Sequence, residues 1–192
     1  IYVGTQQGQM FLTEEGGDVW SELTYNGLPN RFVSDIECSN EDENTAFATF
    51  SGFNSSHVYK TTDRGKSWFD IGKGLPDIPT NCIAVNPDDE KNIFVGTDFG
   101  VFATYNGGET WTPYGTGLPH TMVVDMSFYL PPTPQPDKLT LRIGTHGRSM
   151  WEVDVNASDP VSEPEITAPN GGEIYVAGTN QLISWYGFTP PV

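Results

Sequence analysis

The sequence has few cysteines, few basic residues and no long apolar run, and each scarcity excludes a class of protein. Two cysteines in 192 residues are too few for a disulfide framework. Nine lysines and arginines stand against 25 aspartates and glutamates, a formal charge of -16, so the chain lacks the basic patch that holds a nucleic acid or an anionic membrane. No apolar run approaches the roughly 18 residues that span a bilayer. We therefore expect no nucleic-acid partner and no membrane span.

Glycine, proline and aromatic residues are plentiful instead. Gly (21) and Pro (15) make up about a fifth of the chain and only 36% of it is hydrophobic, a composition that favours turns and short strands over long helices. The 11 Phe, 8 Tyr and 5 Trp can each bury on the order of 150–250 Å², which is enough to build a packed core. We therefore expect an ordered, mostly β protein.

The chain repeats one pattern three times. Each copy has a tryptophan, then Gly-Leu-Pro, and then a fixed position seven residues beyond the leucine. The tryptophans, 48 and 43 residues apart, are Trp20, Trp68 and Trp111. The fixed positions hold Asp35, Cys82 and Asp125. All these markers share one period, so the repeat is a structural unit.

A complete unit contains four short apolar runs separated by turn residues, which is the signal of strands. In the third unit we expect these strands, named A to D, at 80–85, 93–97, 100–104 and 110–114. Four strands in a period of about 40–50 residues indicate a propeller blade, whose sheet cannot bury both faces without neighbours. The predicted fold class is all-β, a partial β-propeller of four-stranded antiparallel blades.

Two of the expected blades are complete and two are incomplete. The complete ones lie at about 33–71 and 80–114, while the first unit lacks strand A. The fourth unit has strands near 122–129, 139–145 and 149–155 but no tryptophan-bearing strand D. We therefore expect residues 1–155 to be the C-terminal piece of a larger propeller, or one part of a larger assembly, whose remaining blades are its partners.

Past the fourth unit the composition changes. Residues 156–165 are polar and contain proline without periodicity, so we expect a linker. Residues 166–192 are similar to the start of an Ig-like surface module and are too few to form a domain unaided. This short C-terminal β extension, following a propeller, implies a secreted or cell-surface protein of bacterial type.

Between strands C and D each unit carries an eight-residue segment that resembles the Asp-box of the BNR repeat, Ser/Thr-x-Asp-x-Gly-x-Ser/Thr-Trp. The second copy matches throughout, with Thr61, Asp63, Gly65, Ser67 and Trp68. The third matches with Asn in place of Asp, with Thr104, Asn106, Gly108, Thr110 and Trp111. The first has Glu15 and Val19 at the polar positions. The family includes sialidases, sortilin-type receptors, xyloglucanase-type glycoside hydrolases and many secreted bacterial proteins, so the resemblance implies a propeller and export.

The box residues have a local structural interpretation. A short polar side chain accepts backbone N–H groups, a glycine supplies a positive φ and the tryptophan anchors the turn. The alternative is that Asp63 and its equivalents bind calcium or substrate. A calcium site wants six to eight oxygens, whereas each box has one or two carboxylates, so we expect structure and no cofactor. Weak calcium binding by the acidic runs 41–43 and 88–90 stays open.

In a propeller the B–C and D–A loops open on one face, which usually carries the site. Residues predicted to face a ligand there are Gln6, Asp98, His120, His146 and Arg148. The segment 96–100 is similar to the Thr-Asp-x-Gly-Gly segments of xyloglucanase-type hydrolases, which makes Asp98 a tentative catalytic acid; the alternative is an Asx turn residue. Glycoside hydrolysis ordinarily needs two carboxyl groups, and this chain offers one candidate, so it has no complete catalytic set.

The remaining polar side chains receive structural interpretations. His146 lies in the segment 144–151, which resembles one that recurs in the closing blades of this family, so we expect a blade-to-blade hydrogen-bond clamp more than acid–base chemistry. We expect His57 and His120 to be solvated, and Cys38 to be a small buried residue. Asp35 and Asp125 are expected to bond water in the central channel.

The leading hypothesis is a secreted recognition or scaffold module that binds protein or glycan through its B–C and D–A loop face. The alternative is part of a glycoside hydrolase, xyloglucanase- or sialidase-like, whose other catalytic residues lie upstream. A third hypothesis is a sortilin-like receptor that binds peptide in its tunnel.

Overall fold

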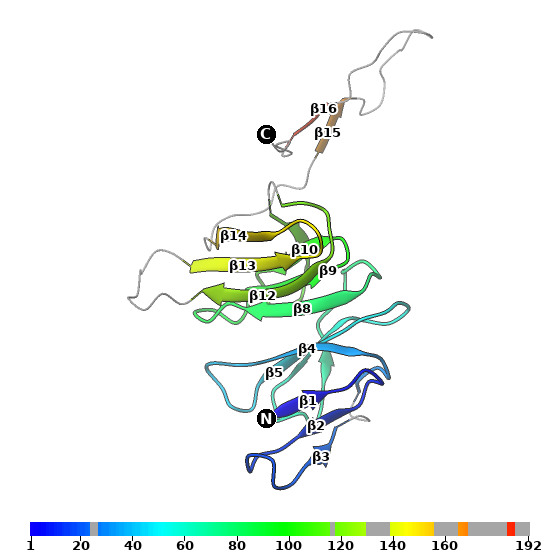
Figure 1. The fold of residues 1–192 in the computed structure, drawn as a ribbon, viewed down its shortest axis with the longest axis vertical. Coiled ribbons are helices and arrows are strands. Elements are labelled where there is room, and N and C mark those ends of the chain that lie inside the picture. The colour runs from blue at the N-terminus through cyan, green and yellow to red at the C-terminus, as the bar shows by residue number, and fades with distance from the viewer. Residues whose placement is uncertain (24–26, 116–117, 130–138, 156–164, 169–183, 187–192) are drawn as a thin grey trace.

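The computed structural model describes the chain except residues 24–26, 116–117, 130–138, 156–164, 169–183 and 187–192 (Figure 1). Every regular element among the described residues is a β-strand. Hence no described segment forms a helix long and apolar enough to cross a membrane. The all-β prediction is confirmed.

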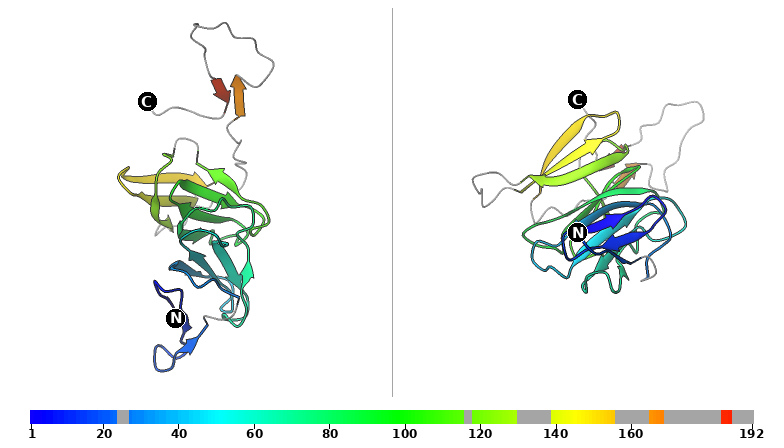
Figure 2. Two further views of the ribbon diagram at one scale, coloured as in Figure 1. Left: turned by 90° about the vertical axis from the view of Figure 1, so that its right-hand side faces the viewer. Right: turned by 60° about the horizontal axis from the view of Figure 1, so that its bottom comes forward.

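Four antiparallel sheets follow one another along the chain, and we call them blades 1 to 4 (Figures 1 and 2). Blade 1 has β1 (Tyr2–Gly4), β2 (Met10–Leu12) and β3 (Ser21–Glu22). Blade 2 has β4 (Val33–Cys38), β5 (Ala46–Phe50), β6 (Val58–Thr61) and β7 (Phe69–Asp70). Blade 3 has β8 (Thr80–Val85), β9 (Ile93–Thr97), β10 (Gly100–Thr104) and β11 (Thr112–Tyr114). Blade 4 has β12 (Val123–Tyr129), β13 (Leu139–Thr145) and β14 (Met150–Val155). A separate pair, β15 (Glu165–Ala168) with β16 (Ser184–Tyr186), lies beyond blade 4 (Figure 2).

The arrangement confirms a partial propeller of two four-stranded and two three-stranded blades. Strands A of blades 2, 3 and 4 are β4, β8 and β12, and β8 contacts both of the others. The same irregularity recurs in all three, because the pairing of strand A with strand B shifts register one residue after the strand begins. The bulged residues are Ser34, Asn81 and Val124. The repeat is therefore structural down to single positions.

Three apolar clusters hold the blades together, one at each junction. Between blades 1 and 2 the buried residues include Met10, Ala48 and Trp68. Between blades 2 and 3 they include Phe47 and Ile93, and between blades 3 and 4 Phe94 and Leu141. Strands β5 and β9 are buried along their whole length, as expected for sheets covered on both faces. Burying one large apolar side chain contributes about 1.5–3 kcal/mol, so these junctions carry most of the stability.

The box turns are closed by their own side chains. Thr61 Oγ1 accepts the backbone N–H of Gly65 at 2.8 Å, and Gly65 has a φ of +79°. Asp63 Oδ1 accepts the N–H of Ser67 at 2.8 Å and its Oδ2 accepts the Ser67 hydroxyl at 2.6 Å. These hydrogen bonds lower the pKa of Asp63. In the third box Asn106 Oδ1 accepts the N–H of Thr110 at 3.0 Å, so the amide replaces the carboxylate.

The first box keeps only part of this network. Thr13 Oγ1 accepts the N–H of Gly17 at 3.0 Å and that of Glu15 at 3.3 Å. The threonine bonds of the turn therefore persist where the consensus aspartate is replaced.

Candidate functional site

One repeated backbone hydrogen bond builds the loop face, meaning the face of the B–C and D–A loops. In blades 2, 3 and 4 the first residue of the B–C loop donates its N–H to the carbonyl just before strand A. The pairs are Ser51 to Phe32 at 3.0 Å, Asp98 to Pro79 at 3.1 Å and His146 to Met122 at 2.8 Å. Each B–C loop is thus fixed against the end of its D–A loop, so the side chains between them stand on a rigid base.

An aromatic pair stands on this base between blades 3 and 4. The Phe99 ring stacks on the His120 imidazole, with centroids 5.0 Å apart and planes 22° apart. Phe99 is 59% exposed and His120 is exposed as well. His120 was predicted to be a solvated turn residue, and it is exposed but packed on one side by a ring from the neighbouring loop. The sequence did not predict this pairing, because the two residues belong to different loops.

Two further phenylalanines are exposed on the loop face. Phe53 in the B–C loop of blade 2 is 52% exposed, and Phe32 in the preceding D–A loop is 47% exposed. Their loops are neighbours, because Ser51 N–H bonds the Phe32 carbonyl. Groups of large apolar side chains exposed on one face are a feature of binding surfaces.

The tentative catalytic residue Asp98 is held by a neighbouring amide. Asn81 Nδ2 donates to Asp98 Oδ1 at 3.0 Å and to the Val123 carbonyl at 3.1 Å, so one amide joins strand A of blade 3 to blade 4. In the described B–C and D–A loops the other carboxylate is Asp77. Its oxygens accept the N–H of Asn54 at 2.8 and 2.9 Å, and Oδ1 lies 3.2 Å from His57 Nε2. Both carboxylates of the face are engaged by protein groups.

The prediction for His57 is wrong. This side chain is 2% exposed and lies between the Phe50 carbonyl, 2.9 Å from Nδ1, and Asp77. It fastens the B–C loop of blade 2 to the following D–A loop, because both ring nitrogens have oxygen partners.

The backbone of His146 makes two hydrogen bonds, and the predicted blade-to-blade clamp by its side chain stays a prediction. Besides the backbone bond to Met122, its carbonyl accepts the Thr121 hydroxyl at 3.2 Å, so both bonds join loops that border blade 4. Gln6 and Arg148 are exposed in the B–C loops of blades 1 and 4. The loops at blade 4 place His146, Arg148 and His120 on the same side as Phe99.

Most of the negative charge lies on the face opposite the loop face. Its described A–B loops and C–D turns carry eleven carboxylates, against two in the described loops of the loop face. They are Glu14, Glu15, Asp18, Glu41, Asp42, Glu43, Asp63, Asp88, Asp89, Glu90 and Glu109. Three of them, Asp42, Asp63 and Asp89, accept backbone N–H groups of their own turns, as Asp42 does from Asn44 at 3.0 Å. Within the described chain no three metal-ligating side chains gather into a metal site. The loop face is therefore aromatic and nearly neutral in a strongly acidic protein.

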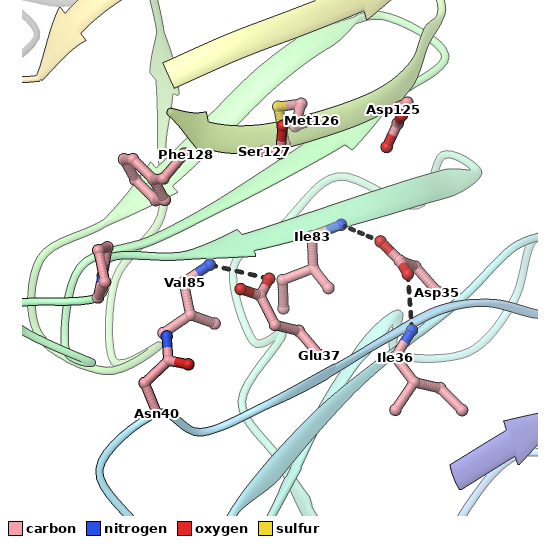
Figure 3. Close-up of a pocket in the computed structure, with 11 residues that line it drawn as sticks. Asp35, Ile36, Glu37, Asn40, Ile83, Val85, Asp125, Met126, Ser127 and Phe128 are labelled. Atoms are coloured by element: carbon pink, nitrogen blue, oxygen red, sulfur yellow. Dashed lines mark hydrogen bonds between the residues drawn. The ribbon is translucent and has the colours of Figure 1, made fainter. Parts of the chain in front are cut away.

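A cleft of about 330 Å³ opens between the inner strands, lined by residues of β4, β8 and β12 (Figure 3). Asp35 was predicted to bond channel water, but its Oδ2 accepts the N–H of Ile83 on the next blade at 3.0 Å. Glu37 Oε2 likewise accepts the N–H of Val85 at 3.1 Å. Burial raises the pKa of Glu37 to about 7 and also raises that of Asp35. Asp35 and Glu37 thus join blades 2 and 3, whereas Asp125 lines the same cleft and is exposed.

The two cysteines are free. Cys82 is buried, and desolvation raises its pKa to about 12. Cys38 was predicted to be buried and is exposed, which corrects that interpretation. Its repeat equivalent Val85 packs against blade 2, whereas Cys38 faces blade 1, which has no described strand A to cover it.

No protein-family model and no curated protein matches the chain. Its fold is similar to solved glycoside hydrolases. An ancestral GH74 enzyme aligns with a TM-score of 0.58 and 13% identity over 80% of this chain and 22% of that one. The GH74 xyloglucanase of Xanthomonas campestris aligns with 0.54 and 15% over 84% of this chain and 28% of that one. The NanB sialidase of Streptococcus pneumoniae aligns with 0.53 and 15% over 79% of this chain and 26% of that one.

The chain thus spans about a quarter of the length of these enzymes. At this level of identity the likeness concerns the fold alone. The chain has a propeller-like fold similar to that of GH74 enzymes and a sialidase.

Proposed function

We propose that this chain is an exported recognition module that binds a glycan through its loop face. The observation that carries the proposal is the exposed Phe99 ring, held in place by its stacking on His120. A flat aromatic ring supplies apolar contact area for the C–H face of a sugar at little cost in conformational entropy. Phe53 and Phe32 would extend this surface across blade 2.

The polar groups around the rings support a neutral or weakly charged ligand. Gln6, His146 and Arg148 offer donors, and Gln6 and His146 also offer acceptors, for the hydroxyls of a sugar. The two carboxylates of the face already have protein partners, and the bulk of the negative charge lies on the other side. A strongly basic partner would find its charge complement on the opposite face, so the loop face favours a glycan over such a protein.

The structural neighbours also support glycan recognition, because their names are those of enzymes that act on glycans. They favour a second candidate function, in which the chain is part of a glycoside hydrolase. In that role Asp98, oriented by Asn81, would be one of the two required carboxyl groups, and the other would come from a segment outside this chain.

Binding of xyloglucan, β-glucan and sialyl oligosaccharides, measured by titration calorimetry, tests the proposal. Phe99→Ala and His120→Ala should weaken binding about tenfold or more, in keeping with the loss of one stacking platform. Phe69→Ala is the matched control, because Phe69 is 57% exposed but lies on the outer strand β7. Equal affinity in all three variants, or no glycan binding, would refute the recognition site. Turnover by a longer form of the protein that is abolished in Asp98→Asn would favour the hydrolase.

A further inference from the structure

Each internal blade turns a set of apolar side chains toward the blade before it, and we call this its backward face. In blade 3 the set comprises Ile93, Val95, Phe102 and Trp111. They pack against Phe47 and Val58 of blade 2. Ile93 and Val95 are 0% exposed and Trp111 is 8% exposed. The Trp111 indole N–H also donates to the Ile71 carbonyl of blade 2 at 2.7 Å. The backward face is thus a built interface with apolar cover and one polar anchor.

Blade 1 carries the same set without any described blade to cover it. The strand pairing makes Ile1, Val3 and Phe11 the equivalents of Ile93, Val95 and Phe102, because Val3 pairs with Phe11 as Val95 pairs with Phe102. The box makes Trp20 the equivalent of Trp111. We call these four residues the open face.

Exposure separates the open face from its buried equivalents. Ile1 is 65%, Val3 40% and Trp20 43% exposed. The blade 2 equivalents Ala46, Ala48 and Trp68 are 0%, 0% and 6% exposed, because they pack on blade 1. Positions that are buried in blades 2 and 3 are therefore exposed in blade 1, where they hold tryptophan, isoleucine and valine. Apolar side chains exposed together in this way are typical of an interaction surface.

A second copy of this chain does not fit the open face through blade 4. At the positions where Phe94 and Ala103 of blade 3 pack on blade 4, blade 4 itself has Arg142 and Glu152. Arg142 Nε donates to Glu152 at 2.8 Å, and its guanidinium lies 3.8 Å from the centroid of the Tyr129 ring. Pressing this ion pair onto isoleucine and tryptophan would strip its water without supplying new polar partners. At these two positions blade 4 is therefore polar where blade 3 is apolar.

We propose that the open face binds the apolar face of a further propeller blade, one with an aromatic side chain where blades 2 and 3 have Phe47 and Phe94. The junction of blades 2 and 3, where the Ile71 carbonyl accepts the Trp111 indole N–H, is the model for a carbonyl that would accept the Trp20 indole. The Trp68 indole at the junction of blades 1 and 2 has no such partner among the described residues. The proposal rests on continuity with the two described junctions and is independent of glycan binding.

The protein itself supplies the probe. Residues 72–140 contain blade 3 and strand A of blade 4, and a copy placed directly before Ile1 restores the natural spacing, because Leu141 and Ile1 are equivalent. The full chain with this extension is compared with the unextended chain by hydrogen exchange of residues 1–12 and by the NMR signal of the Trp20 indole. A matched control carries Phe94→Arg and Ala103→Glu in the added copy only, which gives that copy the polar face of blade 4.

The proposal predicts that exchange of residues 1–12 slows by about tenfold or more with the apolar extension and stays unchanged with the polar one, because exchange reports local opening. The proposal is overturned if exchange of residues 1–12 does not slow with the apolar extension, or if it slows equally with both extensions. Sedimentation of the unextended chain adds an independent outcome. A dimer in which residues 1–12 become protected would mean that a second copy covers the open face, and would also overturn the proposal.

Discussion

Replacing Phe94 by alanine should be among the most destabilising single changes in this chain. The ring is 0% exposed at the junction of blades 3 and 4 and makes edge-on contacts with Tyr114, at 4.8 Å between centroids, and Phe128, at 5.7 Å. Buried Phe-to-Ala changes cost about 3–5 kcal/mol, through lost burial and the cavity left behind. At roughly 2–4 °C per kcal/mol for a domain of this size, the melting temperature should fall by about 6–20 °C.

The repeat offers its own control, because Arg142 is the blade 4 equivalent of Phe94. The Arg142 and Glu152 side chains are 41% and 60% exposed, so their ion pair contributes at most about 1 kcal/mol. Urea and thermal unfolding followed by circular dichroism compare Phe94→Ala with Arg142→Ala, with the slope against urea showing whether the two unfold alike. Equal losses of stability in the two variants would refute the assignment of covered and uncovered blade faces.

Three further changes test other parts of the structure. Gly96→Ala should cost about 1–3 kcal/mol, because its Cβ would lie 2.4 Å from a sulfur and 2.6 Å from a valine of the next blade, whereas Gly144→Ala, with nothing nearer than 3.5 Å, should be tolerated in the same thermal unfolding assay. Burial raises the pKa of Glu37 from 4.5 to about 7, so the folded state binds this proton more tightly than the unfolded chain. The resulting stabilisation, at most about 3 kcal/mol, is present below pH 4.5 and lost as the pH rises through 7, and Glu37→Gln should remove that part of the pH dependence of the urea midpoint. Thr61→Val should lower the unfolding free energy by about 1 kcal/mol, since it removes the hydroxyl that accepts the N–H of Gly65 at 2.8 Å; a wild-type urea midpoint in this variant would contradict the role of the turn.

The strands of blade 3 could be predicted from the sequence because their signals are local. The ranges 80–85, 93–97 and 100–104 coincide with β8, β9 and β10. The fourth strand was placed at 110–114 but begins at Thr112, because the N–H of Thr110 bonds Asn106 within the box turn. The hydrogen bonds of the box turn therefore shorten a strand that the hydrophobic periodicity of the sequence predicts to be longer.

The candidate site was less predictable, because its contacts join distant parts of the chain. His57 stands beside two serines, which suggests solvent, yet it is buried by a carboxylate twenty residues away. Phe99 and His120 come from loops of different blades, and the local signal was only a phenylalanine in a short polar loop. Cys38 was misplaced because its burial depends on a strand that blade 1 does not have among the described residues. The sequence repeat predicts which residues occupy equivalent positions, but the exposure of each side chain depends on the blade that packs against its copy of the repeat.

The most direct test of glycan binding by the loop face is to map the binding site by NMR chemical shifts during titration with xyloglucan, β-glucan and sialyl oligosaccharides. If the loop face is the binding site, the perturbed signals cluster at Phe99, His120 and the adjoining B–C loops, while the signals of the acidic turns on the opposite face stay unchanged. Perturbations centred on those acidic turns, or no perturbation with any of the glycans, would contradict it.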